Sequence, residues 1–413
     1  MSTPARPRFA LSLSWTLVGE VLYAAGQFAM LMVMARLGSA TVLGQYALGL
    51  AIATPLFVLT SLHLRPAFVV ASSTDGHGFG HYVALRLIGV PLSMVALAIW
   101  SFIAGYDPAT GAMILTVGLV RCSDFISDVL QAAPARAEHL RYVGISRALR
   151  GVAVVASVAS AMAAGLPPAW ALGVGAVVGM LVTLLYDFPV ARRYEPVRPR
   201  FEGRALWRLA WLTAPVGVAG AVLGLTQNMP AYVLEDVGSM EELGRYTAAV
   251  SVLFVSAMFN LAIGGAAVPR LARTFETSAQ AFKRFLLKVV LVVAGLNTCI
   301  LLGSIAVGEL YLRIAYGAPM ATLHGELVWA GVIAIAAGVA NLLSQTVVST
   351  RSFRTQFVVS LSGMVVALVL SLVLIPGRGL HGALLALGGV HLWRVTLYII
   401  TVLVITRARA RSS

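Results

Sequence analysis

The sequence predicts an all-α polytopic membrane protein in which twelve transmembrane helices form two parallel six-helix bundles around a central cavity. Three observations support this fold: the composition, the alternation of basic segments and an internal repeat. Of the 413 residues, 59% are hydrophobic and only 11% are charged, and the mean hydropathy is +0.89. Soluble domains average about 45–50% apolar and about 25% charged residues. Lipid is therefore the solvent that suits this chain.

The apolar segments are long enough to cross a bilayer, which takes about 20 residues in a helix. In chain order the predicted spans are 11–35, 43–63, 82–104, 111–132, 147–165, 169–190, 206–228, 246–268, 285–307, 325–348, 357–375 and 382–405. The first run is too long for a cleaved signal peptide. Most connections are short, which favours hairpins of neighbouring helices.

Basic residues alternate from loop to loop and predict the orientation. With the N-terminus in the cytoplasm, the outer side carries only Arg36, Arg245, Arg313 and Arg378, while Arg121 and Arg394 fall within spans. The rest of the 30 lysines and arginines gather on the other side. This pattern follows the positive-inside rule and predicts a multi-pass protein of the bacterial inner (cytoplasmic) membrane with both termini cytoplasmic.

A repeat at an offset of 200 residues relates the two halves. Residues 38–46 read GSATVLGQY after the first span, and residues 238–246 read GSMEELGRY after the seventh. Six spans separate the copies, so the halves share one orientation, which is a recurrent transporter design. A basic linker from Ala191 to Arg204 separates them. We therefore predict an N-terminal bundle over 1–195 and a C-terminal bundle over 196–413.

Composition also excludes several classes of function. The net charge of +14 would suggest nucleic acid in a soluble protein, but here the cations flank apolar spans, so no nucleic-acid partner is expected. No phosphate-binding loop or nucleophile elbow occurs, and the histidine pair His77 and His81 lacks a third metal ligand. We expect no cofactor, no metal and no catalytic residues.

Ionisable residues inside spans are costly and usually face a bundle interior or a wet cavity. Glu20 lies in the first span, Arg394 lies in the twelfth, and the fourth holds Arg121, Asp124 and Asp128. The last three are spaced i, i+3 and i+7, so they share a helix face, and Arg121 can pair with Asp124. Two interpretations stay open: a hydrophilic cavity that attracts an anion, or a polar lock between helices.

Further candidates for a substrate cavity are Arg36, Arg65, Arg86, Asn228 and Arg245. Arginine suits phosphate because its planar fork donates to two oxygens. For Arg65 and Arg86 the alternative is ordinary placement at the cytoplasmic boundary.

Several segments, taken in order, resemble a known family. They are Leu64-Arg65-Pro66, Ser123-Asp124-x-x-Ser127-Asp128-x-x-Gln131, Ser146-Arg147-x-x-Arg150-Gly151, Asn228-Met229-Pro230-Ala231-Tyr232 and Leu243-Gly244-Arg245-Tyr246. This pattern is similar to bacterial polysaccharide or oligosaccharide flippases of the Wzx type, within the multidrug/oligosaccharidyl-lipid/polysaccharide (MOP) superfamily, and it covers most of the chain.

The resemblance implies alternating access and a substrate that is an undecaprenyl-diphosphate-linked oligosaccharide, either a lipopolysaccharide O-unit or an exopolysaccharide repeat. Its implied partners are the lipid-linked oligosaccharide, the bilayer and polysaccharide polymerase or export components. One departure affects the site: the family often carries arginine after Asn-x-Pro, and here that residue is Ala231.

Two other functions remain as alternatives. A cation-coupled multidrug exporter of the same fold would use Glu20, Asp124 and Asp128, although Arg121 and Arg394 oppose a cationic drug. A glycan-modifying membrane enzyme would need a large outer loop or intramembrane histidines, and the outer loops are short.

Overall fold

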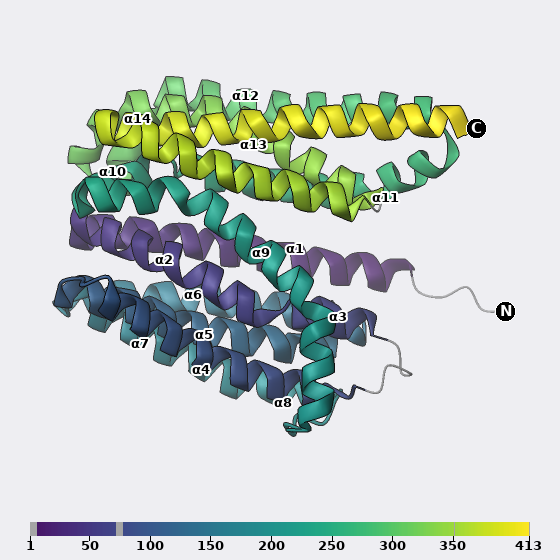
Figure 1. The fold of residues 1–413 in the computed structure, drawn as a ribbon. Helices are drawn as coiled ribbons and strands as arrows, with labels where there is room; N and C mark the ends of the chain where they lie inside the picture. Colours follow the sequence, from purple (N-terminus) through teal and green to yellow (C-terminus); the bar gives the residue numbers. More distant parts are fainter. Residues whose placement is uncertain (1–5, 72–76, 351, 413) are drawn as a thin grey trace. The chain divides into compact units, whose positions relative to one another are not determined.

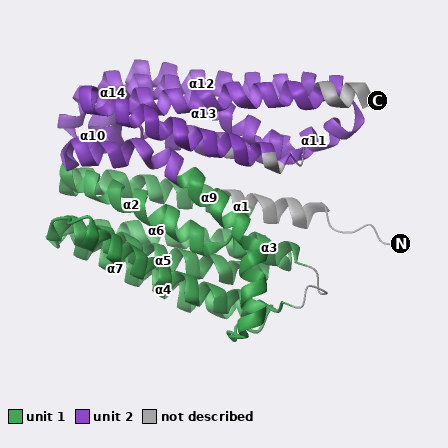
Figure 2. Cartoon of the chain, viewed as in Figure 1, with its two compact units in different colours: residues 1–224 green, residues 225–413 purple. Residues whose placement is uncertain are grey.

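A computed structural model of the chain describes residues 6–71, 77–350 and 352–412 (Figure 1). Every regular element in these residues is helical. By contacts the chain divides into two compact units, residues 1–224 and 225–413 (Figure 2). The helix α9 (Gly203–Val237) crosses this boundary. The boundary predicted between residues 195 and 196 lies in the linker before α9 and stays a prediction, and residues 1–5 of that first domain lie outside the described part.

Unit 1 contains the helices of the first six predicted spans. They are α1 (Arg6–Val33) with the π-helical η1 (Met34–Gly38), α2 (Ala40–Ser61), α3 (Leu64–Val70), α4 (Phe79–Ile103), α5 (Pro108–Arg136), α6 (Leu140–Ala163), α7 (Pro168–Val182), the π-helical η2 (Thr183–Asp187) and α8 (Phe188–Ala191).

Unit 2 contains the end of α9 and the helices of the remaining spans. These are α10 (Met240–Ala249), α11 (Val252–Thr277), α12 (Ala279–Tyr316), the 3-10 helix η3 (Ala318–Leu323), α13 (His324–Ser349) and α14 (Phe353–Ser412). The last two predicted spans both lie in α14, which is interrupted at Gly379, where φ is +50°. Glu242 supports this break, since its Oε1 accepts from the backbone N–H of Leu380 at 2.8 Å.

Within the described residues, ten helical segments are long and apolar enough to cross a membrane. This number and the twelve predicted spans differ for two reasons. The segment Thr355–Thr406 holds two predicted spans, and α5 is absent from the ten. We attribute that absence to the charges on α5, which include Arg121, Asp124 and Asp128.

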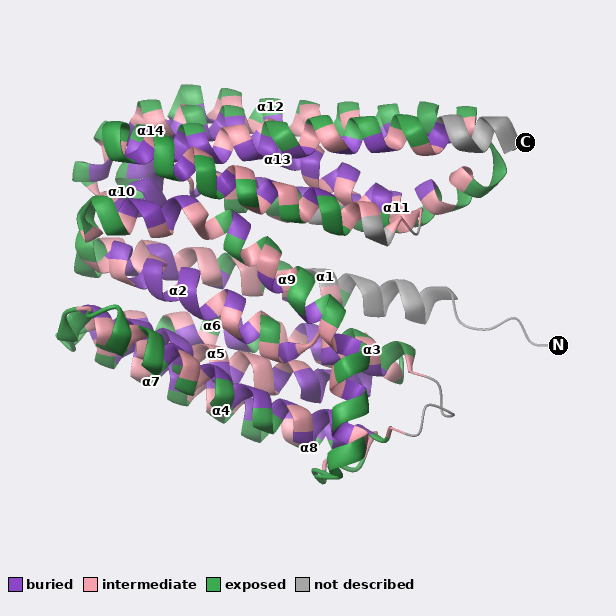
Figure 3. Ribbon diagram, viewed as in Figure 1, coloured by how far each residue is buried: buried purple, intermediate pink, exposed green. Residues whose placement is uncertain are grey.

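Apolar side chains are exposed along the helices, as expected for a surface that faces lipid (Figure 3). Leu291 of α12 and Val373 of α14 are 62% and 69% exposed. Leu185 in η2 is 75% exposed. In water such a surface would cause aggregation, so its extent supports the membrane assignment.

The internal repeat has the same local structure in both units. Ser39 and Ser239 are the N-caps of α2 and α10, and their side chains accept from the N–H of Val42 at 3.2 Å and of Glu242 at 3.1 Å. Leu43 and Leu243, the next shared residues, are fully buried. The shared Gly-Ser-x-x-x-Leu-Gly-x-Tyr pattern therefore encodes the same start of a helix twice.

Glycines bring α1 and α6 into close contact. A methyl group at Gly19 would overlap the backbone of Gly144, and one at Gly26 would overlap the backbone of Gly151. The glycines of each helix are seven residues apart, two turns, so they lie on one face. The close approach places the polar residues of α1 against those of α6.

Candidate functional site

The charged face predicted for α5 lies inside unit 1. The predicted ion pair is present, with Arg121 Nη1 3.4 Å from Asp124 Oδ2. Both side chains line a cavity of about 600 Å³ together with Asp128. The polar residues around it come from α1, α3, α4, α5 and α6.

Asp128 is the common partner of three arginines. Its Oδ1 lies 3.5 Å from Arg65 Nη1 and 3.6 Å from Arg147 Nη2, and its Oδ2 lies 3.3 Å from Arg86 Nη2. Arg147 also reaches Glu20 on α1, with 3.6 Å between Nε and Oε1. Three helices are thus joined to α5 through one carboxylate.

Asp124 is satisfied one turn earlier on α5. Its Oδ2 accepts from the hydroxyl of Tyr23 at 3.0 Å, and its Oδ1 lies 3.3 Å from Arg150 Nη1. With Arg121, this carboxylate holds α1 and α6 to α5. Its side chain is 10% exposed, whereas that of Asp128 is 28% exposed.

A sealed polar layer lies behind these residues. Arg150 Nη2 donates to Thr183 Oγ1 at 2.6 Å and lies 3.5 Å from Asp187 Oδ2, which also accepts from Ser127 Oγ at 2.6 Å. Thr183 and Asp187 begin and end η2, where the π-helical turn widens the helix. Arg150 and Asp187 are almost fully buried, so they form a lock between α6, α5 and η2.

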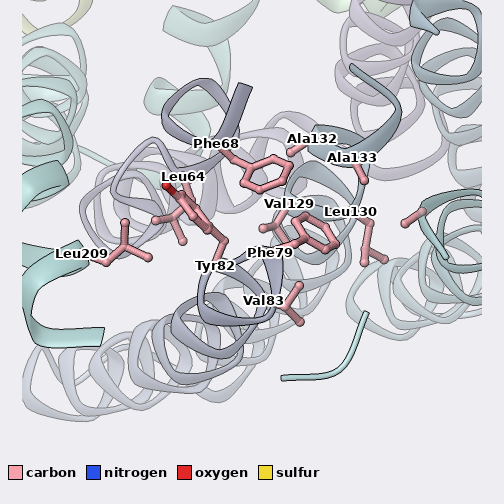
Figure 4. Close-up of a cluster of buried hydrophobic side chains, with 11 residues drawn as sticks. Leu64, Phe68, Phe79, Tyr82, Val83, Val129, Leu130, Ala132, Ala133 and Leu209 are labelled. Atoms are coloured by element: carbon pink, nitrogen blue, oxygen red, sulfur yellow. The ribbon is translucent and has the colours of Figure 1, made fainter. Parts of the chain in front are cut away.

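A break between α2 and α3 places Arg65 at the cavity. Leu62 and His63 have φ of +50° and +49°, a left-handed conformation that side chains rarely adopt. The chain then enters α3, whose Leu64 and Phe68 pack into a buried cluster with Phe79 and Tyr82 of α4 (Figure 4). Phe68 contacts Tyr82 edge to face at 5.1 Å between ring centroids. This packing offsets the strained turn and fixes the direction of Arg65.

Six of the predicted site residues come together here: Glu20, Arg65, Arg86, Arg121, Asp124 and Asp128. Arg86 is buried in α4, not at a boundary, and is only 1% exposed. Arg36 lies at the end of α1 in η1, is exposed and is outside the residues that line this cavity.

The other predicted residues belong to unit 2. Arg245 is exposed on α10, and Asn228 is partly buried on α9. Arg394 is buried in α14, and its Nη2 donates to Asn341 Oδ1 at 3.5 Å. Ala231, where the family often has arginine, is buried on α9.

Sequence reasoning missed Tyr23, Arg147, Arg150 and Asp187 as site residues. Arg147 and Arg150 were assigned to a cytoplasmic loop because the span was expected to begin at residue 147, whereas α6 begins at Leu140. The spacing of Ser146, Arg147 and Arg150 within a helix was the signal that could have placed them.

The polar contacts of unit 2 are of a different kind. Ser256 and Asn260 of α11 and Asn297 of α12 form a buried hydrogen-bonded triad, with Asn260 Nδ2 donating to Ser256 Oγ at 3.0 Å and Asn297 Nδ2 donating to Asn260 Oδ1 at 3.2 Å. Gly338 of α13 leaves room for both amides. This triad joins helices without charge, so the charged site is a feature of unit 1.

A family model described as "Polysaccharide biosynthesis protein" matches residues 33–322. The chain belongs to this family. A curated relative, the capsular polysaccharide biosynthesis protein CapF of Staphylococcus aureus, is 22% identical over 390 residues, which cover 91% of this chain and 94% of CapF. The resemblance drawn from the sequence is confirmed at the level of the family.

Solved structures share the fold. The lipid II flippase MurJ in an inward closed conformation superposes with a TM-score of 0.75 at 12% identity, over 95% of this chain and 87% of MurJ. An inward-facing MATE-family multidrug resistance transporter of the MOP superfamily gives 0.68 at 11% identity, over 95% of each chain. The Vibrio cholerae MATE transporter VcmN gives 0.64 at 12% identity, over 98% of this chain and 97% of VcmN. The predicted MOP-type helical fold is thus confirmed, and the chain is a multi-pass membrane protein.

Proposed function

We propose that this protein flips a polyprenyl-diphosphate-linked oligosaccharide from the cytoplasmic to the outer face of the cytoplasmic membrane by alternating access. The observation that carries the proposal is the excess of arginine around the unit 1 cavity. Arg65, Arg86, Arg121, Arg147 and Arg150 meet the carboxylates of Glu20, Asp124, Asp128 and Asp187. Five cations against four anions leave a net positive charge.

The arginines also have unused donor capacity. The Nε–H groups of Arg86, Arg121 and Arg150 are buried and have no hydrogen-bond partner among the described residues. A buried donor without an acceptor is costly, and an incoming phosphate oxygen or a water would satisfy it. A diphosphate fits such a site because its oxygens can take several planar forks at once.

The family and the neighbours support transport rather than chemistry. The family is one of polysaccharide biosynthesis, and the solved structures that share the fold are described as a lipid II flippase and as transporters. In the proposed cycle the saccharide and diphosphate cross through the protein interior while the lipid tail stays in the bilayer. Polysaccharide polymerase or export components would then take up the product.

The flippase is tested in cells lacking the chain, by analysing the lipid-linked oligosaccharides that accumulate. We expect undecaprenyl-diphosphate-linked units to build up on the cytoplasmic face and polymer export to fall. An Arg65→Gln variant should behave like the deletion, and Arg36→Gln, which changes an arginine outside the cavity, should restore export. Normal polymer in the clean deletion would refute the proposal.

A multidrug exporter of the same fold is the second candidate, since several structural neighbours are drug transporters. Its acids would be Asp124 and Asp128, but each already faces at least two arginines within 3.6 Å. A cationic drug would therefore meet net positive charge. Unchanged drug sensitivity on overexpression is the result we expect.

A further inference from the structure

The cavity of unit 1 contains an anion of its own. We propose that Asp128 is a tethered competitor for the substrate diphosphate: its carboxylate occupies the arginine site when the cavity is empty and is displaced when substrate binds. The inference rests on the proposed function and adds a role for one residue, which would set both affinity and release.

The geometry of the three contacts is the first argument. The distances from Asp128 to Arg65, Arg86 and Arg147 are 3.3 to 3.6 Å. Charge-assisted hydrogen bonds between such groups are usually about 2.7–2.9 Å long. A single carboxylate with two oxygens is too small to meet three guanidinium groups at that length, whereas a diphosphate has more oxygens and a wider span. The site therefore holds Asp128 loosely.

Burial is the second argument, because it separates Asp128 from the other acids. The side chains of Asp128, Arg65 and Arg147 are 28%, 20% and 19% exposed. Asp187 and Arg150 are 2% and 3% exposed, and Asp124 is 10% exposed. The sealed pairs lock the helices, while the Asp128 contacts open to the 600 Å³ cavity and can be exchanged.

The arrangement also explains how a high-affinity arginine site releases its substrate. Binding requires the diphosphate to replace Asp128, and release is assisted when Asp128 takes the arginines back. Substrate and carboxylate then compete with negative coupling, which lowers affinity and speeds exchange. Arg65 is on α3, beyond the strained turn at Leu62 and His63, so the exchange acts directly on that helix.

The test measures binding of farnesyl diphosphate to the purified full-length protein in nanodiscs, with farnesol as the uncharged control. We expect Asp128→Asn to bind the diphosphate roughly tenfold more tightly than wild type, in the usual range of coupling between two ligands. Turnover in proteoliposomes should fall, so affinity and rate move in opposite directions. A purely structural role for Asp128 would weaken both.

Glu20→Gln is the matched control, because it removes one negative charge beside the same cavity but from only one arginine, Arg147. We expect its affinity to stay within about twofold of wild type. An equal gain in both variants would reduce the effect to general electrostatics and overturn the inference. Unchanged or weaker binding by Asp128→Asn would also overturn it and leave the flippase proposal standing.

Wild-type protein that does not bind farnesyl diphosphate at all would count against both proposals. If Asp128→Asn does not fold, infrared difference spectra of wild-type protein labelled with ¹³C-aspartate decide the matter. Adding inorganic pyrophosphate should shift an aspartate carboxylate stretching band, since the displaced group loses its arginine partners. Spectra without such a shift would refute displacement.

Discussion

At the scale of single residues, burial divides the charged groups of unit 1 into two classes. Arg150 and Asp187 face each other out of reach of solvent, with Ser127 and Thr183 completing their hydrogen bonds. Such a pair adds little net stability compared with apolar packing, but removing one partner leaves a buried charge alone. The sealed pair is therefore best read as structure, and the more exposed arginines as the part that meets substrate.

Replacing Arg150 with methionine tests this division. We expect Arg150→Met to lower the free energy of unfolding by about 3–5 kcal/mol, because Asp187 stays buried without its cation. The double variant Arg150→Met/Asp187→Leu should recover most of the loss. Thermal unfolding of the purified protein in detergent measures both, and a double variant as unstable as the single one would contradict the assignment.

Prediction from sequence reached those residues whose partners lie on the same helix. Arg121, Asp124 and Asp128 were found because helical spacing alone places them on one face. Arg147, Arg150 and Asp187 were missed because their roles depend on α6 and η2 packing against α5, a tertiary fact that hydropathy does not encode. Long apolar helices, by contrast, follow from composition and could be predicted almost in full.

At the scale of elements, the crossing of α1 and α6 determines where the site forms. Glu20 and Tyr23 of α1 lie in the same stretch as Gly19 and Gly26, so the close approach at the glycines presses these side chains toward Arg147 and Asp124. In a membrane, small residues at a helix interface are a main source of association because lipid offers no hydrophobic drive between helices.

A methyl group at this crossing should therefore be costly. We expect Gly144→Ala to destabilise the protein by about 1–3 kcal/mol, since the new Cβ would overlap the backbone carbonyl of Trp15. Gly173→Ala on α7 is the control, because nothing lies within 4 Å of a Cβ there. The control should be neutral or slightly stabilising, and equal losses for both variants in thermal unfolding would argue against close packing as the cause.

At the scale of the whole molecule, the orientation in the membrane remains a prediction from the basic residues, and it decides the direction of transport. The turn between α5 and α6 should face the cytoplasm, and the turn between α6 and α7 should face outward. Ala137 and Ala164 are exposed residues in these two turns. They offer matched positions, since each replaces one alanine at the end of a helix.

Cysteine labelling in intact cells distinguishes the two orientations. In a background with Cys122 and Cys299 changed to serine, a membrane-impermeant maleimide should label Ala164→Cys at once and Ala137→Cys only after permeabilisation. The reverse pattern would invert the topology and make the unit 1 cavity charges face the opposite compartment during loading. Because a flippase that serves polysaccharide synthesis must take its substrate from the side where the sugars are assembled, this measurement constrains the direction of transport independently of the cargo.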